Sequence, residues 1–160
     1  ARAGRFGVGM ALAILGGNPH RFKPLVDIYR EAGLEAGHSL EQLQVGVTGH
    51  VYLAETTEQA LDEFYPYYSN YWYYVNRQRG MGTRMSRQDF EYMASPESAL
   101  FVGSPELVAE KILHQHELYG HTRFLGQMDI GGLPFEKVKR NIELLAREVV
   151  PRVRKALNKM

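Results

Sequence analysis

The feature that most constrains this chain is an alternation of short apolar runs with longer segments of helical periodicity. The apolar runs cover residues 7–15, 45–54, 99–102 and 122–130, and a segment with apolar residues every three or four positions follows each of them. Strands joined through helices lie parallel, because a crossover of that length returns the chain to the starting end of the sheet. The sequence therefore predicts an α/β fold of four parallel strand-plus-helix units.

The predicted helices carry start and stop signals. Asn18, Thr56 and Ser104 stand where a side-chain oxygen can cap the helix that follows each of the first three strands. Proline lacks a backbone N–H, and its ring obstructs the preceding turn of a helix. Pro66 is therefore expected to kink or divide the second long helix, and Pro151 to end or bend the last one.

Two architectures use such units, the doubly wound sheet and the (β/α)8 or TIM barrel. A complete barrel needs about 250 residues, whereas this chain has 160. We therefore expect a single domain over residues 1–160 and, if it is a barrel, a partial one or one completed by another chain. Half a barrel leaves strand edges and an apolar interior uncovered, so self-association into a homo-oligomer is expected.

Charge and composition narrow the classes of partner. With 19 basic and 18 acidic residues the net charge is +1, which gives no electrostatic reason to expect binding to nucleic acid or to an anionic membrane. No apolar stretch is long enough to cross a membrane. The absence of cysteine excludes disulfides and thiolate chemistry. A cytoplasmic location is the expectation.

Ligands of parallel α/β folds bind at the carboxyl ends of the strands. That rule selects Gly16 and Gly17, whose bare backbone can approach a flat ligand, and His50, which can act as an acid, a base or a hydrogen-bond partner. It also selects Gln127, whose amide can bond to a heterocycle. The alternatives are a simple strand-to-helix turn at the glycines and a core histidine satisfied by its neighbours.

Two other clusters were considered for function. His114 and His116 are two positions apart and cannot share a helix face, and no HExxH-type motif occurs, so no metal site is expected. The tyrosine-rich segment 65–74 lacks interleaved basic residues, which argues against stacking on nucleic acid. An interface helix or an active-site cover is the preferred interpretation, because tyrosine and tryptophan suit half-wet contacts.

The chain resembles the C-terminal part of luciferase-like flavin monooxygenases. The resemblance is carried by a GSPE helix start, an AEK run, a strand that ends in Gln127 and a GGLP turn, in that order, within FVGSPELVAEKILHQHELYGHTRFLGQMDIGGLPFEKV. Two upstream segments resemble preceding units of the same family, namely ALAILGGNPHRFKPLVDIYREA and VGVTGHVYLAETTEQALDEFYPYY.

The resemblance implies half of a (β/α)8 barrel whose partners are reduced FMN, or in some branches a deazaflavin, and a small organic substrate. It implies that Gly16 and Gly17 lie near the flavin, that His50 lies near the flavin ring or the substrate as the catalytic candidate, and that Gln127 faces the same cavity. It also implies that the tyrosine-rich helix belongs to the outer surface or to a subunit contact.

The N-terminal half of such a barrel, which carries the loop for the flavin phosphate, has no counterpart in this sequence. We therefore expect that the chain alone neither binds FMN tightly nor turns over, and that the full-length protein is an FMN-dependent monooxygenase. Two alternatives stay open: a deazaflavin-dependent oxidoreductase on the same barrel, and a non-catalytic α/β assembly module with a tyrosine-rich interface.

Overall fold

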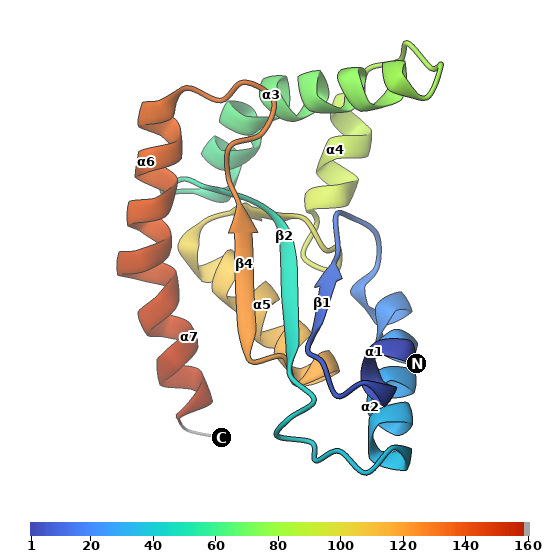
Figure 1. Cartoon of the computed structure of the whole chain (residues 1–160). Coiled ribbons are helices and arrows are strands. Elements are labelled where there is room, and N and C mark those ends of the chain that lie inside the picture. The colour runs from blue at the N-terminus through green and yellow to red at the C-terminus, as the bar shows by residue number, and fades with distance from the viewer. Residues whose placement is uncertain (159–160) are drawn as a thin grey trace.

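A computed structural model describes residues 1–158 of the chain. Strands and helices alternate along it (Figure 1). The elements are α1 (Arg2–Arg5), β1 (Met10–Ala13), a 3₁₀ turn (Pro19–Phe22), α2 (Lys23–Glu35), β2 (Val45–Leu53), α3 (Thr57–Gln78), α4 (Arg87–Ala94), β3 (Phe101–Gly103), α5 (Pro105–Tyr119), β4 (Arg123–Gln127), α6 (Phe135–Leu144), a π turn (Leu145–Val149) and α7 (Val150–Leu157).

All strand pairs are parallel, as the alternation predicted, and β2 is the strand that the others share. β1 pairs with the first part of β2 from Met10↔Val45 to Ala13↔Thr48, and β4 pairs with it up to His50↔Gln127. The short β3 pairs with the last three residues of β2, up to Leu53↔Gly103. The carboxyl ends of β1, β2 and β4 therefore meet at one edge of the sheet, and α3 lies across that edge (Figure 1).

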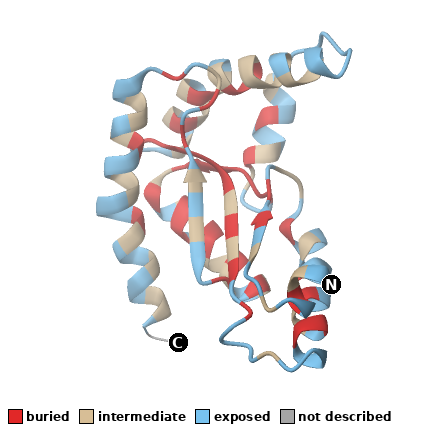
Figure 2. Cartoon of the chain, in the orientation of Figure 1, coloured by how far each residue is buried: buried red, intermediate tan, exposed pale blue. Residues whose placement is uncertain are grey.

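Helices cover one face of the sheet and leave the other open. In Figure 1, α5 lies behind the strands, whereas nothing covers the side toward the viewer. Burial follows this arrangement, because alternate residues of a strand face opposite sides. Val45 and Val47 are buried on the helix side, while Arg123, Leu125 and Gln127 are exposed on the open side (Figure 2).

The core consists of three apolar clusters on the covered side and beneath α3. One joins β1 and β2 to α2, another joins β2 and β3 to α5 and α7, and the third fills the space beneath α3 and α4. Their largest enclosed members include Tyr29, Phe64, Tyr68, Phe90, Phe101 and Tyr119. Within residues 1–158 none of the three clusters lies on the open face of β1 and β4, so the helices pack mainly against the other face of these strands.

α3 runs through Pro66 without dividing and the last helix continues through Pro151, so neither proline divides or ends its helix. Pro66 is exposed, so the carbonyl group that loses its partner can bond to water. Pro151 follows directly on the π turn, whose wider turn makes room for the ring. The strands are also shorter than the apolar runs, since 7–9 and 128–130 are loop.

Two contacts attach neighbouring elements to the carboxyl edge. The ladder with β4 stops at His50, so the N–H of Leu53 has no strand partner there, and it donates instead to Oδ1 of Asn141 in α6 at 2.5 Å. Gly131, with φ +69°, packs directly on the Tyr67 carbonyl of α3, where a Cβ atom would overlap it. Asn70 Nδ2 donates to Gly131 O at 3.1 Å.

Candidate active site

The structure brings the four candidate residues to the carboxyl edge. His50 and Gln127 are register partners, and paired residues of parallel strands face the same side, here the open one. The N–H of Ile14 donates to Thr48 O at 2.9 Å, which places Gly16 and Gly17 just beyond the end of β1 and next to this pair. The site is therefore assembled from β1, β2 and β4 together.

His50 is almost fully enclosed, with 1% of its surface exposed. Its Nδ1 lies 3.3 Å from the hydroxyl of Tyr68, and its ring meets the rings of Tyr68 and Tyr71 edge-on, with centroids 5.7 and 5.3 Å away. Burial lowers the pKa of His50 to about 4, so the imidazole is neutral at pH 7. A neutral imidazole can exchange a hydrogen bond or accept a proton, but it carries no charge for a ligand.

The two glycines differ in what they require. Gly17 has φ +81°, a conformation that glycine adopts without strain, and its carbonyl accepts bonds from Ala99 N at 2.9 Å and Ser98 Oγ at 3.3 Å. Gly16 lies against the terminal methyl group of Met93 in α4. Gly17 thus fixes the turn to the loop before β3, which is the role that the simpler interpretation gave it, while Gly16 lines a pocket together with Met93.

An apolar pocket of about 420 Å³ opens at this edge. It lies beside the end of β1, and its walls come from four parts of the chain: Ala13, Leu15, Gly16, Phe22, Trp72 and Met93. Phe22, Trp72 and Met93 were not predicted as site residues. Phe22 ends the 3₁₀ turn before α2, Trp72 lies in α3 and Met93 lies in α4. Only the tertiary fold brings segments so far apart in sequence to the end of one strand.

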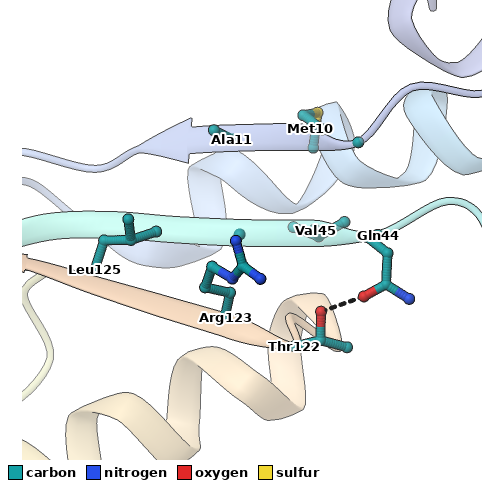
Figure 3. Close-up of a pocket in the computed structure, with 9 residues that line it drawn as sticks. Met10, Ala11, Gln44, Val45, Thr122, Arg123 and Leu125 are labelled. Carbon is teal, nitrogen blue, oxygen red and sulfur yellow. Dashed lines mark hydrogen bonds between the residues drawn. The ribbon is translucent and has the colours of Figure 1, made fainter.

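A larger pocket of about 510 Å³ lies at the opposite, amino-terminal ends of β1, β2 and β4 (Figure 3). Thr122 Oγ1 donates to Gln44 Oε1 at 2.5 Å on its border, and Arg123 and Leu125 extend over the open face. Parallel α/β folds keep their chemistry at the carboxyl ends, and the amino ends serve stability. We therefore assign this hollow to the uncovered face of the sheet rather than to a reaction site.

A charged network lies close to the site, between α3 and α6. Glu63 of α3 accepts hydrogen bonds from Tyr52 at 2.6 Å, from Lys137 of α6 at 2.5 Å and from Gln59 at 2.6 Å. Burial raises the pKa of Glu63, but these three donors outweigh it and lower the pKa to about 2. The carboxylate therefore joins α3 to α6 and keeps its charge near neutral pH.

The tyrosine-rich helix does not lie wholly on the outer surface, which corrects the expectation drawn from the resemblance. Tyr68 is fully buried next to His50, whereas Tyr74, nearer the end of α3, is 55% exposed. The buried part follows from the position of α3 across the strand ends (Figure 1), where Tyr68 and Tyr71 contact His50. Sequence periodicity could not give this position, because both faces of the helix carry tyrosine.

Residues 1–158 contain neither a candidate metal cluster nor a candidate membrane-spanning helix. No group of three or more histidine, cysteine, aspartate or glutamate side chains is arranged to hold a metal ion there. No helix in the same range combines the length and apolarity needed to cross a bilayer.

Solved structures with the same fold include monooxygenases and a coenzyme F420-dependent reductase. Monooxygenase RslO1 from Streptomyces bottropensis is 23% identical with a TM-score of 0.73, and the match covers 94% of this chain and 43% of that one. The oxygenating constituent of 3,6-diketocamphane monooxygenase from Pseudomonas putida, solved with FMN, is 21% identical with a TM-score of 0.70, covering 95% and 44%. The coenzyme F420-dependent tetrahydromethanopterin reductase from Methanopyrus kandleri is 22% identical with a TM-score of 0.60, covering 94% and 47%.

The chain thus spans less than half of each of these proteins. At such identities the likeness establishes the fold, and the open parallel sheet is part of a (β/α)8 barrel. No curated protein sequence matches the chain significantly. The sequence model of the luciferase-like monooxygenases, however, matches residues 1–122, which is more than half of the chain. The chain therefore belongs to the luciferase-like monooxygenase family.

Proposed function

We propose that this chain supplies half of the active site of an FMN-dependent monooxygenase, with the flavin ring at the carboxyl edge on the open face. The observation that carries the proposal is that an apolar pocket, lined by other residues, and the His50–Gln127 pair lie at the same carboxyl edge of the sheet. Family membership supports the flavin, and the related Pseudomonas putida protein was solved with FMN. FMN and a small organic substrate are the proposed ligands.

The residues present fit the ring of a flavin. Ala13 and Gly16 leave room beside the strand end, and Leu15 and Trp72 provide apolar walls for a flat heterocycle. The exposed Gln127 amide can both donate to and accept from the polar edge of such a ring. When bound, a reduced flavin supplies the redox chemistry toward dioxygen or substrate.

The same pocket does not account for the flavin phosphate. None of the side chains that line it is basic, and a phosphate is usually bound by arginine, lysine or a helix amino terminus. The phosphate contacts then come from residues outside this pocket. We therefore expect weak flavin binding and no turnover by the chain alone.

The roles proposed for the chain's own groups follow from their chemistry. His50 is neutral at pH 7 and contributes a hydrogen bond or takes up a proton at its free ring nitrogen. Gln127 orients the ligand beside it. Tyr68 and Tyr71 cover His50 from α3 and keep water away from the ring.

A deazaflavin is the second candidate cofactor. The related Methanopyrus kandleri reductase depends on coenzyme F420, and a deazaflavin ring has nearly the same outline as a flavin ring. The pocket therefore admits both rings, and the choice between monooxygenase and dehydrogenase or reductase chemistry depends on which one binds.

The experiment uses the full-length protein that contains this chain. Absorbance and fluorescence spectra after titration with FMN, and separately with a deazaflavin, are expected to reveal tight binding of FMN. A deazaflavin spectrum would select the second candidate. Failure to bind either would overturn the proposal and favour the non-catalytic assembly module. For the chain alone, stoichiometric FMN retained through gel filtration would contradict the half-site.

Self-association is the corresponding proposal for the isolated chain. β1 and β4 each pair only with β2 among the described residues, and the open face exposes Leu125 and Leu15. Unpaired strand edges and uncovered apolar side chains favour association with a second copy. Light scattering is expected to give a mass above one chain, and a monodisperse monomer would refute this.

A further inference from the structure

The hydroxyl group of Tyr68 lies between two atoms of the proposed site. Its oxygen is 3.3 Å from His50 Nδ1 and 3.4 Å from the carbonyl oxygen of Leu15. Tyr68 and His50 are both buried. Since Leu15 follows β1 and His50 lies in β2, a single hydroxyl from α3 bridges the carboxyl ends of both strands.

The position of the hydroxyl proton follows from the partners. A tyrosine hydroxyl has one proton to donate and two lone pairs to accept with. The Leu15 carbonyl can only accept, and the Tyr68 hydroxyl is its one hydrogen-bond donor within the described part of the chain. Burial also raises the pKa of Tyr68 to about 12, so the hydroxyl keeps its proton at neutral pH. With that proton directed to Leu15, the oxygen faces His50 with a lone pair, and Nδ1 must carry a hydrogen.

We propose that Tyr68 is a positioning residue that holds the neutral His50 ring in the Nδ1–H form and leaves Nε2 as an unprotonated acceptor. Nε2 has no partner among residues 1–158, and the fully enclosed side-chain atoms without a partner there are Trp72 Nε1, Gln115 Oε1 and His121 Nδ1. His50 Nε2 is not one of them, so this nitrogen is not fully enclosed although the residue as a whole is only 1% exposed.

This arrangement sets which ligand group the site accepts. An unprotonated Nε2 binds an N–H or O–H group, or takes a proton from it, and rejects a bare carbonyl oxygen. Gln127, the register partner of His50 on β4, lies on the same side of the sheet, and its amide N–H can donate a hydrogen bond to an acceptor next to that group of the ligand. The inference deepens the proposed function because His50 is one of its site residues, but the ring form itself requires no cofactor.

Nitrogen NMR of the chain with ¹⁵N-labelled histidine tests the proposal, with His50→Asn to assign the His50 signals among the six histidines. At pH 7 we expect a protonated Nδ1 and an unprotonated Nε2. Nε2–H in the wild type would overturn the proposal. No flavin is added, so the outcome is independent of whether the full-length protein binds one.

Two hydroxyl deletions separate positioning from packing. Tyr68→Phe removes the acceptor oxygen and is expected to convert most of the His50 population to the Nε2–H form. Tyr71→Phe is the matched control, because Tyr71 touches the His50 ring edge-on without a hydrogen bond to it, and it should leave the Nδ1–H form unchanged. An unchanged ring form in Tyr68→Phe would refute the role of Tyr68. The wild-type spectrum decides the ring form even if that variant fails to fold.

Discussion

Replacing Asn141 by alanine should destabilise the chain because it leaves a buried backbone group without a partner. Asn141 is 1% exposed, its Oδ1 accepts from the N–H of Leu53 at 2.5 Å, and its Nδ2 donates to Lys137 O at 2.8 Å. The ladder to β4 ends at His50, so no strand can replace this acceptor. Loss of the acceptor leaves the Leu53 N–H unsatisfied at a cost of about 1–3 kcal/mol.

Two smaller terms modify that figure. Alanine is the better helix former by about 0.5 kcal/mol, and the cavity left by the amide works in the opposite direction. We expect a net loss of about 2 kcal/mol in the free energy of unfolding, measured as a lower urea midpoint at unchanged slope.

Glu143→Ala is the control for this substitution, because Glu143 is exposed on the same helix. It should change stability by less than about 0.5 kcal/mol. Asn141→Asp keeps an acceptor oxygen and should fall between the other two variants at a pH where the carboxyl is protonated. If Asn141→Ala matched Glu143→Ala, the claim that a side chain in α6 completes the edge of β2 would be refuted.

Three further predictions concern buried or constrained positions. Burial lowers the pKa of His50 and of His121 from 6.5 to about 4. As the pH falls, the unfolded chain therefore takes up these protons before the folded one, and the free energy of unfolding should fall between pH 6.5 and 4 by roughly 3 kcal/mol per histidine. Urea midpoints that stay constant over this window would contradict the prediction. Burial lowers the pKa of Lys111 from 10.5 to about 7, so the wild type should gain stability relative to Lys111→Met by about 1 kcal/mol per unit between pH 8 and 9, and parallel pH curves would exclude this. Gly17→Ala should cost about 1 kcal/mol from backbone strain alone, since a Cβ at this φ of +81° meets no atom within 4 Å; a loss of several kcal/mol in thermal unfolding would indicate an unseen contact.

The alternation of strands with helices and the parallel direction of the strands could be predicted from the sequence, because both depend on local patterns. When apolar strands are covered by helices and joined by crossovers of helix length, the strands pair in parallel. The same rule predicted that His50 and Gln127 would meet at the carboxyl edge, and they are register partners. The caps at Asn18, Thr56 and Ser104 were also predicted, and each accepts the expected backbone N–H.

The walls of the site could not be predicted, because they depend on how helices cross the strand ends. Tyr68 and Trp72 lie four positions apart in a segment where nearly every face is aromatic, so periodicity does not select the side that meets His50. Met93 reaches Gly16 from a short helix in the segment with the weakest pattern. That Pro66 does not divide its helix and Pro151 does not end its own has another cause: Pro66 is exposed to solvent, and a π turn precedes Pro151.

The contact of Gly131 with α3 makes the geometry of His50 dependent on a residue that touches no part of it. A methyl group at 131 would overlap the Tyr67 carbonyl, so α3 and the turn after β4 could no longer lie at their present separation. Tyr68 is the next residue along that helix. Substitution of a single hydrogen atom in the turn would thus change how closely the hydroxyl approaches the imidazole, and relatives with larger residues there would need a differently seated helix.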